Sequence, residues 1–236
     1  LERGDEGVFI AEAVDHLVSR IYAYMALGIV HLRKGNLDLA IQSLERAYQM
    51  AERADLRMAR AMVAGYLGRA YTLSNQAGRA IEILKQAVEA AAAMRLMVDQ
   101  AMRLVHLGDA YLHIDDLEQA ISVARAALQN SLDYDQRGAA AWAQWLLGEI
   151  NTRADKSAEA QSHYRNAMML ASELGMAPLL AHCHFSLGKG YSPASGNEHG
   201  REHLVAAADL YRSLEMPSWI REVEMRLGRL QVSLST

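Results

Sequence analysis

The chain has 236 residues, of which 51% are hydrophobic and 22% are charged, and its formal net charge is −4. This acidic balance offers no basic footprint for nucleic acid, so we expect no nucleic-acid partner. No apolar run of 18 residues is present, which predicts no membrane-spanning helix and no membrane partner. Cys183 is the single cysteine, which excludes an intrachain disulfide and fits a reducing, cytoplasmic location.

One dipeptide, Leu-Gly, recurs six times, and each copy begins forty residues after the last. Its leucines are Leu27, Leu67, Leu107, Leu147, Leu187 and Leu227. A fixed period of about 20–50 residues is typical of repeat proteins, in which each unit buries its apolar face only against its neighbours. The period therefore predicts a stacked array without a single central core.

The first predicted element belongs to a repeat that begins before the chain does. Residues 6–14 (EGVFIAEAV) fall where a preceding second helix would end, so we interpret residues 1–14 as the remnant of a repeat. Asp15 aligns with Asp55, so the first helix of repeat one starts near Asp15. Because the chain begins with Leu, we expect a fragment of a longer polypeptide; a tag-processed small protein is the alternative.

Five two-helix repeats follow, at about 15–54, 55–94, 95–134, 135–174 and 175–215. Helix A carries Leu-Gly, as at 58–73, and helix B follows, as at 77–92. Residues 216–236 supply only a helix A, at roughly 218–232, which we expect to cap the last apolar face. No window alternates with period two over a strand length, so the sequence predicts one all-α domain over residues 1–236.

The turns between helices A and B have their own column of residues, namely Gly35, Asn75, Asp115, Asp155 and Ser195. Gly and Asn suit the left-handed position after a helix, and Asp tolerates it. Asn36 and Asp116 are good N-cap residues for the following helix B. Pro178 and Pro217 are expected just before their A helices, where a missing N–H costs nothing.

Small residues mark the second helix of each repeat. One column holds Ala40, Ala80, Ala120, Ala160 and Gly200, and another holds Ala47, Ala87, Ala127, Ala167 and Ala207. Gly in one helix and Ala in the next let two backbones approach closely. Leu-Gly-x-x-Tyr, then Ala, then Ala resembles the tetratricopeptide (TPR) pattern, with a longer unit than the usual length of about 34 residues. The resemblance implies a TPR-like α-solenoid, a right-handed superhelix of helix-turn-helix repeats.

Residues typical of catalysis or of metal binding are sparse. Gly188-Lys189-Gly190 lies inside a helix A, so it is not a phosphate loop. His199 and His203 share a helix face at i, i+4, but no His-Glu-x-x-His pattern is present, which favours ordinary packing and surface histidines over a metal site. Cys183 is interpreted as a buried small hydrophobe. We therefore expect no catalytic residue, no cofactor and no metal.

A surface gives the stronger functional signal, because the A helices of a TPR stack line its concave side. In each repeat, the positions five before, two before and two after the leucine of Leu-Gly should face the concave groove. Helices longer than those of the usual TPR unit would shift these positions by one residue. They predict a Met and aromatic strip beside a charged row, which suits an amphipathic helix or extended peptide. The alternative is that these residues pack between A helices or against another domain. The candidate binding residues are Tyr22, Met25, Arg69, Met102, Asp109, Trp142, Trp145, Glu149, Phe185 and Lys189.

A second resemblance covers nearly the whole chain and is clearest at 173–191 (ELGMAPLLAHCHFSLGKGY). This run is similar to the TPR tail of bacterial signalling proteins that carry a class III adenylate/guanylate cyclase domain and then an ATPase domain. Matching runs occur at 7–16, from Gly78 and at 141–149, while Gly190 and the 192–196 turn depart from the pattern. The resemblance implies a non-catalytic, regulatory or protein-interaction tail. Alternatives are a small-molecule sensor like that of maltose-activator-type regulators and a self-associating scaffold, that is, a homo-oligomer.

Overall fold

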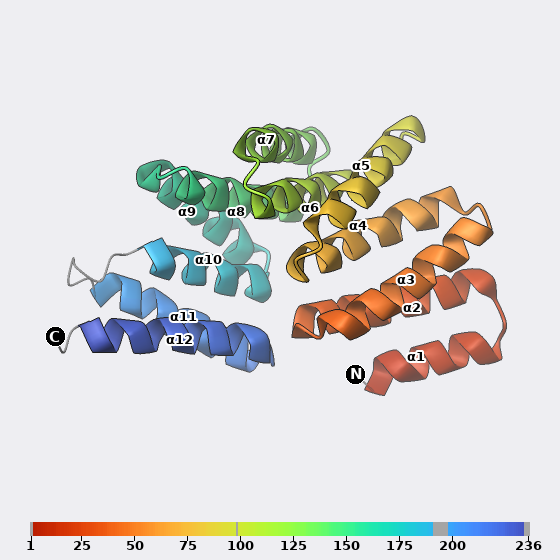
Figure 1. Ribbon diagram of the computed structural model, residues 1–236, viewed down its shortest axis with the longest axis horizontal. Helices are drawn as coiled ribbons and strands as arrows, with labels where there is room; N and C mark the ends of the chain where they lie inside the picture. The colour runs from red at the N-terminus through yellow and green to blue at the C-terminus, as the bar shows by residue number, and fades with distance from the viewer. Residues whose placement is uncertain (1, 98, 191–197, 234–236) are drawn as a thin grey trace. The chain divides into compact units, whose positions relative to one another are not determined.

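Helices alone build the part of the chain that the computed structural model describes, which comprises residues 2–97, 99–190 and 198–233 (Figure 1). These ranges hold twelve helices and no strand, as the repeat pattern predicts. None of the described helices combines the length and the apolar character that crossing a membrane requires. In chain order the helices are α1 (Glu2–Ala13), α2 (Leu17–Lys34), α3 (Leu37–Arg53), α4 (Arg57–Leu73), α5 (Ala77–Ala93), α6 (Gln100–His113), α7 (Leu117–Asp133), α8 (Arg137–Arg153), α9 (Ser157–Glu173), α10 (Ala177–Gly190), α11 (Glu198–Ser213) and α12 (Pro217–Ser233).

Even-numbered helices carry the Leu-Gly pairs and are the A helices; odd-numbered helices are the B helices. The helices predicted at 58–73, 77–92 and 218–232 differ from α4, α5 and α12 by at most one residue at each end. The prediction for the two prolines is wrong in detail. Pro178 is the second residue of α10 and Pro217 the first residue of α12, so both lie inside a first turn. Proline is accepted there because a first-turn N–H has no partner within the helix.

A left-handed residue ends the turn after almost every described helix. Between A and B helices these are Gly35, Asn75, Asp115 and Asp155, as predicted, with φ of 79°, 61°, 64° and 56°. The turns from B to A helices have the same geometry, which the sequence reasoning missed, at Asp15, Asp55, Arg95, Asp135, Gly175 and Glu215. The N–H of the next residue then bonds back five residues, as from Gln76 to the Tyr71 carbonyl at 2.8 Å. This is the Schellman closure, and it fixes a turn every twenty residues.

The two predicted N-caps behave differently. Asp116 Oδ1 accepts a hydrogen bond from the backbone N–H of Gln119 at 3.1 Å, so this cap is confirmed. Asn36 makes no side-chain cap hydrogen bond, so that prediction is wrong. Its backbone lies at φ −83° and ψ 71°, outside the extended region in which a cap side chain usually meets the helix N–H groups. Gly190 ends α10, while Ser195 and the 192–196 turn lie outside the described residues.

The Leu-Gly glycines are the points where each A helix meets its own B helix. A Cβ on Gly28 would lie 2.5 Å from Leu44 Cγ, and one on Gly188 would lie 2.6 Å from Leu204 Cγ. Leu84 fills the same position over Gly68, and Tyr164 fills it over Gly148. A side chain sixteen residues later therefore occupies the space that the glycine leaves. This is the close packing for which the column of glycines is needed.

Two compact units make up the chain, Leu1–Asn130 and Ser131–Thr236. In the first unit α2 contacts α4 and α4 contacts α6; in the second, α8 contacts α10. Successive A helices therefore lie against each other within each unit, as the solenoid requires. Buried Leu44, Leu67 and Leu84 lie at the centre of the first core, and Leu204 and Tyr211 at the centre of the second. That residues 1–236 act as one domain with the predicted repeat boundaries stays a prediction.

On one side of α12, charged residues stand in columns that hold uncharged residues or histidine in the other A helices. Arg221 and Glu224 are exposed, whereas Ala181 and His184 occupy the same columns of α10. Glu224 bonds to Arg212 at 3.0 Å, and a Cβ on Gly228 would meet nothing within 4 Å. A helix with charged residues in these columns tolerates water on this side. That α12 caps the stack stays a prediction.

Candidate binding face on the A helices

The ten candidate residues lie on five A helices, and we call them the A-helix face. In the first unit they are Tyr22, Met25, Arg69, Met102 and Asp109, and in the second unit Trp142, Trp145, Glu149, Phe185 and Lys189. Asp109, Trp145 and Phe185 are buried, with exposed fractions of 3%, 9% and 4%. The other seven are half-buried. The face therefore combines residues that pack inside the stack with residues that reach solvent.

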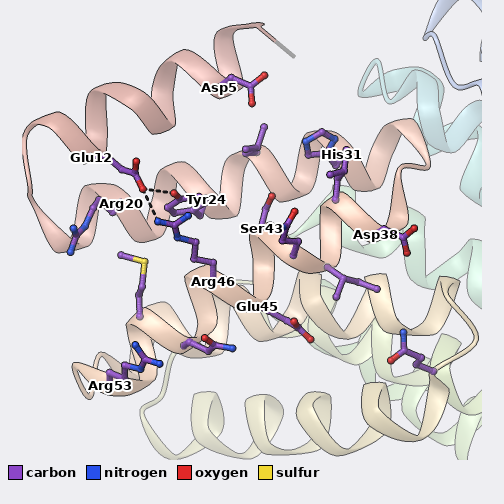
Figure 2. A pocket seen from close by; sticks show the side chains of 17 residues that line it. Asp5, Glu12, Arg20, Tyr24, His31, Asp38, Ser43, Glu45, Arg46 and Arg53 are labelled. Carbon is purple, nitrogen blue, oxygen red and sulfur yellow. Dashed lines mark hydrogen bonds and ion pairs between the residues drawn. The ribbon is translucent and has the colours of Figure 1, made fainter.

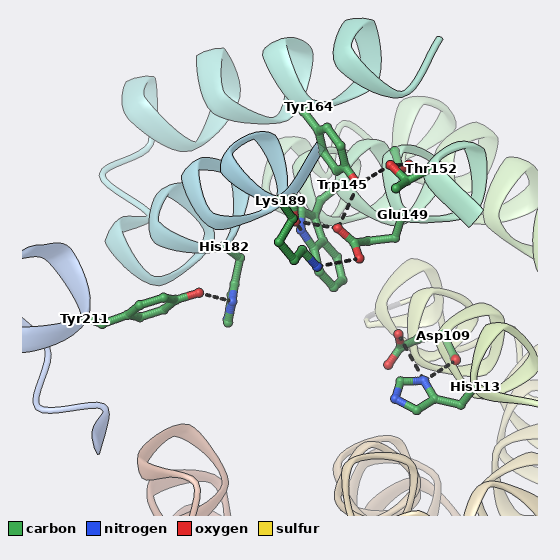
Figure 3. A network of polar contacts seen from close by, with 11 residues as sticks. Asp109, His113, Trp145, Glu149, Thr152, Tyr164, His182, Lys189 and Tyr211 are labelled. Carbon is green, nitrogen blue, oxygen red and sulfur yellow. Dashed lines mark hydrogen bonds and ion pairs between the residues drawn. The ribbon is translucent and has the colours of Figure 1, made fainter. Parts of the chain in front are cut away.

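An ion pair joins the two charged residues of the first unit. Arg69 Nη1 on α4 donates to Asp109 Oδ2 on α6, and the two side chains are only 14% and 4% exposed. His113 adds to this site: its Nδ1 lies 2.9 Å from the Asp109 carbonyl oxygen and 3.6 Å from Oδ1 (Figure 3). Asp109 thus reaches its buried position with a cation beside it, as a buried carboxylate must.

Beside this pair, His106 links α6 to α4. Its Nδ1 lies 2.9 Å from the carbonyl oxygen of Gly65, and its side chain is buried. Burial, followed by the charge of Arg69, lowers the pKa of His106 to about 3. The ring is therefore neutral near pH 7 and donates its Nδ1 proton to the Gly65 carbonyl. A Cβ on Gly65 would lie 3.2 Å from Arg103 Cγ, so glycine at this position lets the Arg103 side chain pack closely against α4.

Glu149 is the hub of a polar network in the second unit (Figure 3). Its Oε1 accepts hydrogen bonds from the Tyr164 hydroxyl at 2.7 Å and from the Ser186 hydroxyl. Its Oε2 forms an ion pair with Lys189 Nζ at 3.4 Å. Trp145 Nε1 donates to Ser186 Oγ at 3.2 Å, so the indole is held by the same network. Burial, followed by the charge of Glu149, raises the pKa of Tyr164, which stays a hydrogen-bond donor.

The charged row of the sequence is therefore two ion pairs, Arg69 with Asp109 and Glu149 with Lys189. Each pair joins consecutive A helices, because a spacing of forty residues places the same column one repeat further on. Both carboxylates already have a cation of the chain as a neighbour, so a partner's charge would have to compete with it.

An aromatic cluster surrounds His182 in the second unit. Ring centroids of Trp142, Trp145, Tyr211 and Trp219 lie 5.8, 5.9, 5.5 and 4.5 Å from that of His182. The Tyr211 hydroxyl lies 2.7 Å from His182 Nδ1 and is its hydrogen-bond partner (Figure 3). Trp142 and Trp145 meet edge to face at 5.7 Å, so Trp145 is enclosed while Trp142 stays half-buried at the rim.

Tyr164, His182, Ser186, Tyr211 and Trp219 were not among the predicted site residues. One signal was present for Tyr164, which replaces Leu in the column that covers the glycines. Another was present for His182, which shares the column of Trp142. The sequence gives no signal for Ser186, because its hydrogen bond to Glu149 depends on how α10 packs against α8.

The residues considered for chemistry lie in ordinary environments. Cys183 is 0% exposed, and burial, followed by the charge of Glu149, raises the pKa of its thiol to about 12. His182 and His184 have different partners: His182 Nδ1 lies 2.7 Å from the Tyr211 hydroxyl, and His184 Nδ1 lies 2.9 Å from His203 Nδ1. His199 pairs with Glu202 at 3.2 Å. Among the described residues no group of three or more His, Cys, Asp or Glu is placed to hold a metal ion.

Comparisons with known proteins agree with this fold. Models of the tetratricopeptide repeat match residues 19–93 and 103–134. Apo RapI is 12% identical with a TM-score of 0.65 and is similar over 98% of this chain and 96% of its own. A Rap protein complexed with Competence and Sporulation Factor is 14% identical with a TM-score of 0.71, over 99% of this chain and 69% of its own.

A third structure is a signal transduction ATPase with numerous domains (STAND) from Pyrococcus horikoshii, which has a tetratricopeptide repeat sensor. It is 18% identical with a TM-score of 0.63, and the likeness covers 92% of this chain and 33% of that one. No curated protein matches the chain. The helix pairs, the glycine column and the matched models lead to one conclusion: tetratricopeptide repeats are recognised at residues 19–93 and 103–134, and the described helices have the fold of a TPR-like α-solenoid.

Proposed function

We propose that this chain is a non-catalytic interaction module that binds a protein or peptide segment on the A-helix face. Trp142 carries the proposal: it is a half-buried tryptophan at the rim of an aromatic cluster whose other members are packed against one another. A tryptophan held by such neighbours keeps its apolar edge toward solvent at little entropic cost. Residues of this kind are enriched among those that dominate binding energy.

The ion pairs define what the partner meets beside Trp142. Lys189 is 31% exposed while Glu149 is 18% exposed, so solvent reaches the cation more than the carboxylate. Lys189 Nζ also lies 4.8 Å from the Phe185 ring centroid, over its face. A partner in the second unit should therefore bring an apolar group to Trp142 and an acceptor or carboxylate to Lys189.

In the first unit the proposed face is made of Tyr22, Met25 and Met102, all half-buried. Methionine side chains adapt to partners of different shape, which suits a module that binds a segment through its apolar face. The binding of Competence and Sporulation Factor by a Rap protein of similar fold supports a binding role for repeats of this kind. The interaction there belongs to that protein, and the residues proposed here come from this chain alone.

We also propose that the chain is the regulatory tail of a signalling protein with cyclase and ATPase domains. The similarity of residues 173–191 to such tails supports this. The STAND ATPase with a tetratricopeptide repeat sensor supports the same order of domains, because the structural match covers only 33% of that longer chain. The coding sequence that surrounds this chain is the direct test: upstream cyclase and ATPase motifs support the proposal, and a frame without them contradicts it.

The binding proposal is tested with a partner isolated by pull-down and then purified. Affinity is measured by calorimetry for the parent, for Trp142→Ala and for Met169→Ala. Met169 lies on the B helix α9 and is 55% exposed, so it is a matched apolar control away from the A-helix face. We expect Trp142→Ala to weaken binding by about tenfold or more. Equal affinities of all three folded proteins would contradict the proposed face.

A further inference from the structure

A pocket of about 1320 Å³ lies on the other side of α2, lined by α1, α2 and α3 (Figure 2). Its walls include Asp5 on α1, His31 on α2 and Leu39 on α3. Tyr22 and Met25 of the A-helix face do not line it, so it is separate from the binding face proposed above. The volume exceeds the roughly 300–1,000 Å³ of common small-molecule sites, so a peptide side chain with its backbone fits inside.

The repeat register explains why space is left at this place. Forty residues further on, the positions of Asp5, His31 and Leu39 are occupied by Glu45, Tyr71 and Arg79. These three side chains fill the second repeat. The Tyr71 hydroxyl donates to Glu45 Oε1 at 2.6 Å, and Arg79 Nη2 lies 3.1 Å from the same oxygen.

Arg79 also covers the Tyr71 ring, with its guanidinium carbon 4.1 Å from the ring centroid. In the first repeat a shorter carboxylate, a smaller ring and an aliphatic residue replace this set. Among the side chains that the structure describes, the matching positions of the first repeat hold His31 and Leu39 and therefore neither a phenol nor a guanidinium. The polar ends of one aromatic and one cationic side chain, which the neighbouring repeat contains, are thus missing at the pocket.

Three polar side chains that line this pocket, those of His31, Asp5 and Asp38, have unpaired atoms among the residues that the structure describes. His31 is 7% exposed, and its Nδ1 is buried without a hydrogen bond. Asp5 and Asp38 are exposed, and neither carboxylate has an ion pair or a hydrogen bond among the described residues. Leu39, the residue in the place of Arg79, is 47% exposed. A buried polar atom without a partner is costly, so a ligand that supplies one is stabilised there.

At the opposite end of the pocket most charged groups are paired with one another, although Arg20 Nε is buried without a hydrogen bond. Glu12 accepts hydrogen bonds from the Tyr24 hydroxyl at 2.5 Å and from Arg46 at 2.8 Å, and the Arg46 guanidinium lies 4.3 Å from the Tyr24 ring centroid. Arg20 pairs with Asp15 at 2.9 Å. Figure 2 shows Asp5, His31 and Asp38 away from Arg20 and Arg53. The acidic end, with its free carboxylates, is therefore where a cationic group is attracted.

We propose that this pocket binds a peptide segment that presents an arginine next to an aromatic residue. The arginine guanidinium takes the place that the Arg79 guanidinium holds in the second repeat and meets Asp5 and Asp38. The aromatic ring lies against His31, whose imidazole stands at the position of the Tyr71 ring. Charge-assisted bonds between guanidinium and carboxylate give the site its selectivity for arginine. The ligand class is thus inferred from Tyr71 and Arg79, the side chains that stand at the matching positions one repeat later.

The probe is a blocked pentapeptide with one tyrosine and one arginine, and the control peptide carries citrulline in place of arginine. Citrulline keeps the shape of arginine and removes its charge. Binding to the whole chain is followed by titration in NMR spectra. We expect the arginine peptide to bind up to about fivefold more tightly than the citrulline peptide, because about fivefold is the upper range for exposed ion pairs. Asp5→Asn should remove most of this difference.

The decisive variant fills the pocket with the side chains of the next repeat, Asp5→Glu with His31→Tyr and Leu39→Arg. We expect this triple variant to unfold at the same temperature as the parent or a higher one and to lose binding of the arginine peptide. Trp142→Ala, on the other unit, should bind the peptide as the parent does, so a failure here is distinct from a failure of the A-helix face. Equal binding of both peptides, or unchanged binding by the folded triple variant, would overturn the proposal.

Discussion

Glu149 and Lys189, forty residues apart, form an ion pair across α8 and α10, with Oε2 and Nζ separated by 3.4 Å. Arg69 and Asp109 have the same relationship in the first unit. Because one period separates the two members of each pair, the charged column of one repeat neutralises that of the next. Within each unit, the charged residues of the A-helix face are therefore paired with each other. The part of the face that remains for a partner is mainly apolar.

Loss of the cation in the more buried pair should be costly. Arg69→Met leaves the Asp109 carboxylate, whose side chain is 4% exposed, without its cation. We expect the free energy of unfolding to fall by about 3 kcal/mol, because an uncompensated buried charge remains. Urea unfolding measures this, with Arg33→Met as the control at an exposed position of α2, expected within about 0.5 kcal/mol of the parent. Similar losses in both variants would show that the pair is not what holds α4 to α6.

Stability should fall in mild acid because of His106. Its pKa is about 3 in the folded chain and near 6.5 when unfolded, so the unfolded state takes up the proton first. The stabilisation is complete above pH 6.5 and is lost as the pH falls toward 3. One group contributes a loss of about 2 kcal/mol between pH 7 and pH 5. His106→Gln removes this group, so its urea midpoint should change less over that range. Parallel pH profiles for parent and variant would contradict the buried, neutral ring.

Two glycines should respond to alanine in opposite directions. A Cβ on Gly68 would collide with three carbon atoms of Leu84, so Gly68→Ala should destabilise by about 1–3 kcal/mol. A Cβ on Gly78 in α5 would meet nothing within 4 Å, so Gly78→Ala should stabilise by about 0.5–1 kcal/mol through helix propensity. Gly108→Leu, in the same column of α6 as Gly68, should also destabilise. Thermal midpoints that moved the same way for Gly68→Ala and Gly78→Ala would argue against the glycine packing.

Most of the fold could be predicted from the forty-residue period of the sequence. This period predicted the positions of the helices and the left-handed turns at Asn75 and Asp155, because one residue type recurs at a fixed distance from Leu-Gly. The pairing of Glu149 with Lys189 also follows from the period, since residues forty apart lie in contact on adjacent A helices. From the sequence alone, both residues are instead expected to face a partner.

Other features depend on packing that no column shows. Asn36 does not cap α3, although its residue type suits a cap, because the backbone of its turn is set by the closure around Gly35. Ser186 reaches Glu149 from a different column, and its role follows from the side-chain positions of both. The pocket beside His31 could not be predicted from the sequence, because only the structure shows that Tyr71 and Glu45 bond to each other at the matching positions of the second repeat.

Purified chain should show no enzymatic turnover, since no described group provides a nucleophile with a lowered pKa or a metal site. The measurement is release of phosphate from ATP and formation of cyclic nucleotide, beside a mock purification. We expect rates equal to those of the mock sample. Turnover that follows the purified chain and is absent from the mock sample would contradict the assignment of a non-catalytic module.

Photo-crosslinking from single positions tests the central claim most directly. A benzophenone side chain replaces Met25 or Trp142 on the A-helix face, or Met169 on the exposed side of α9, and each folded protein is irradiated with its purified partner. The account predicts crosslinks to the partner from the positions of Met25 or Trp142 and none from that of Met169. Crosslinks from the Met169 position alone would contradict binding on the A-helix face.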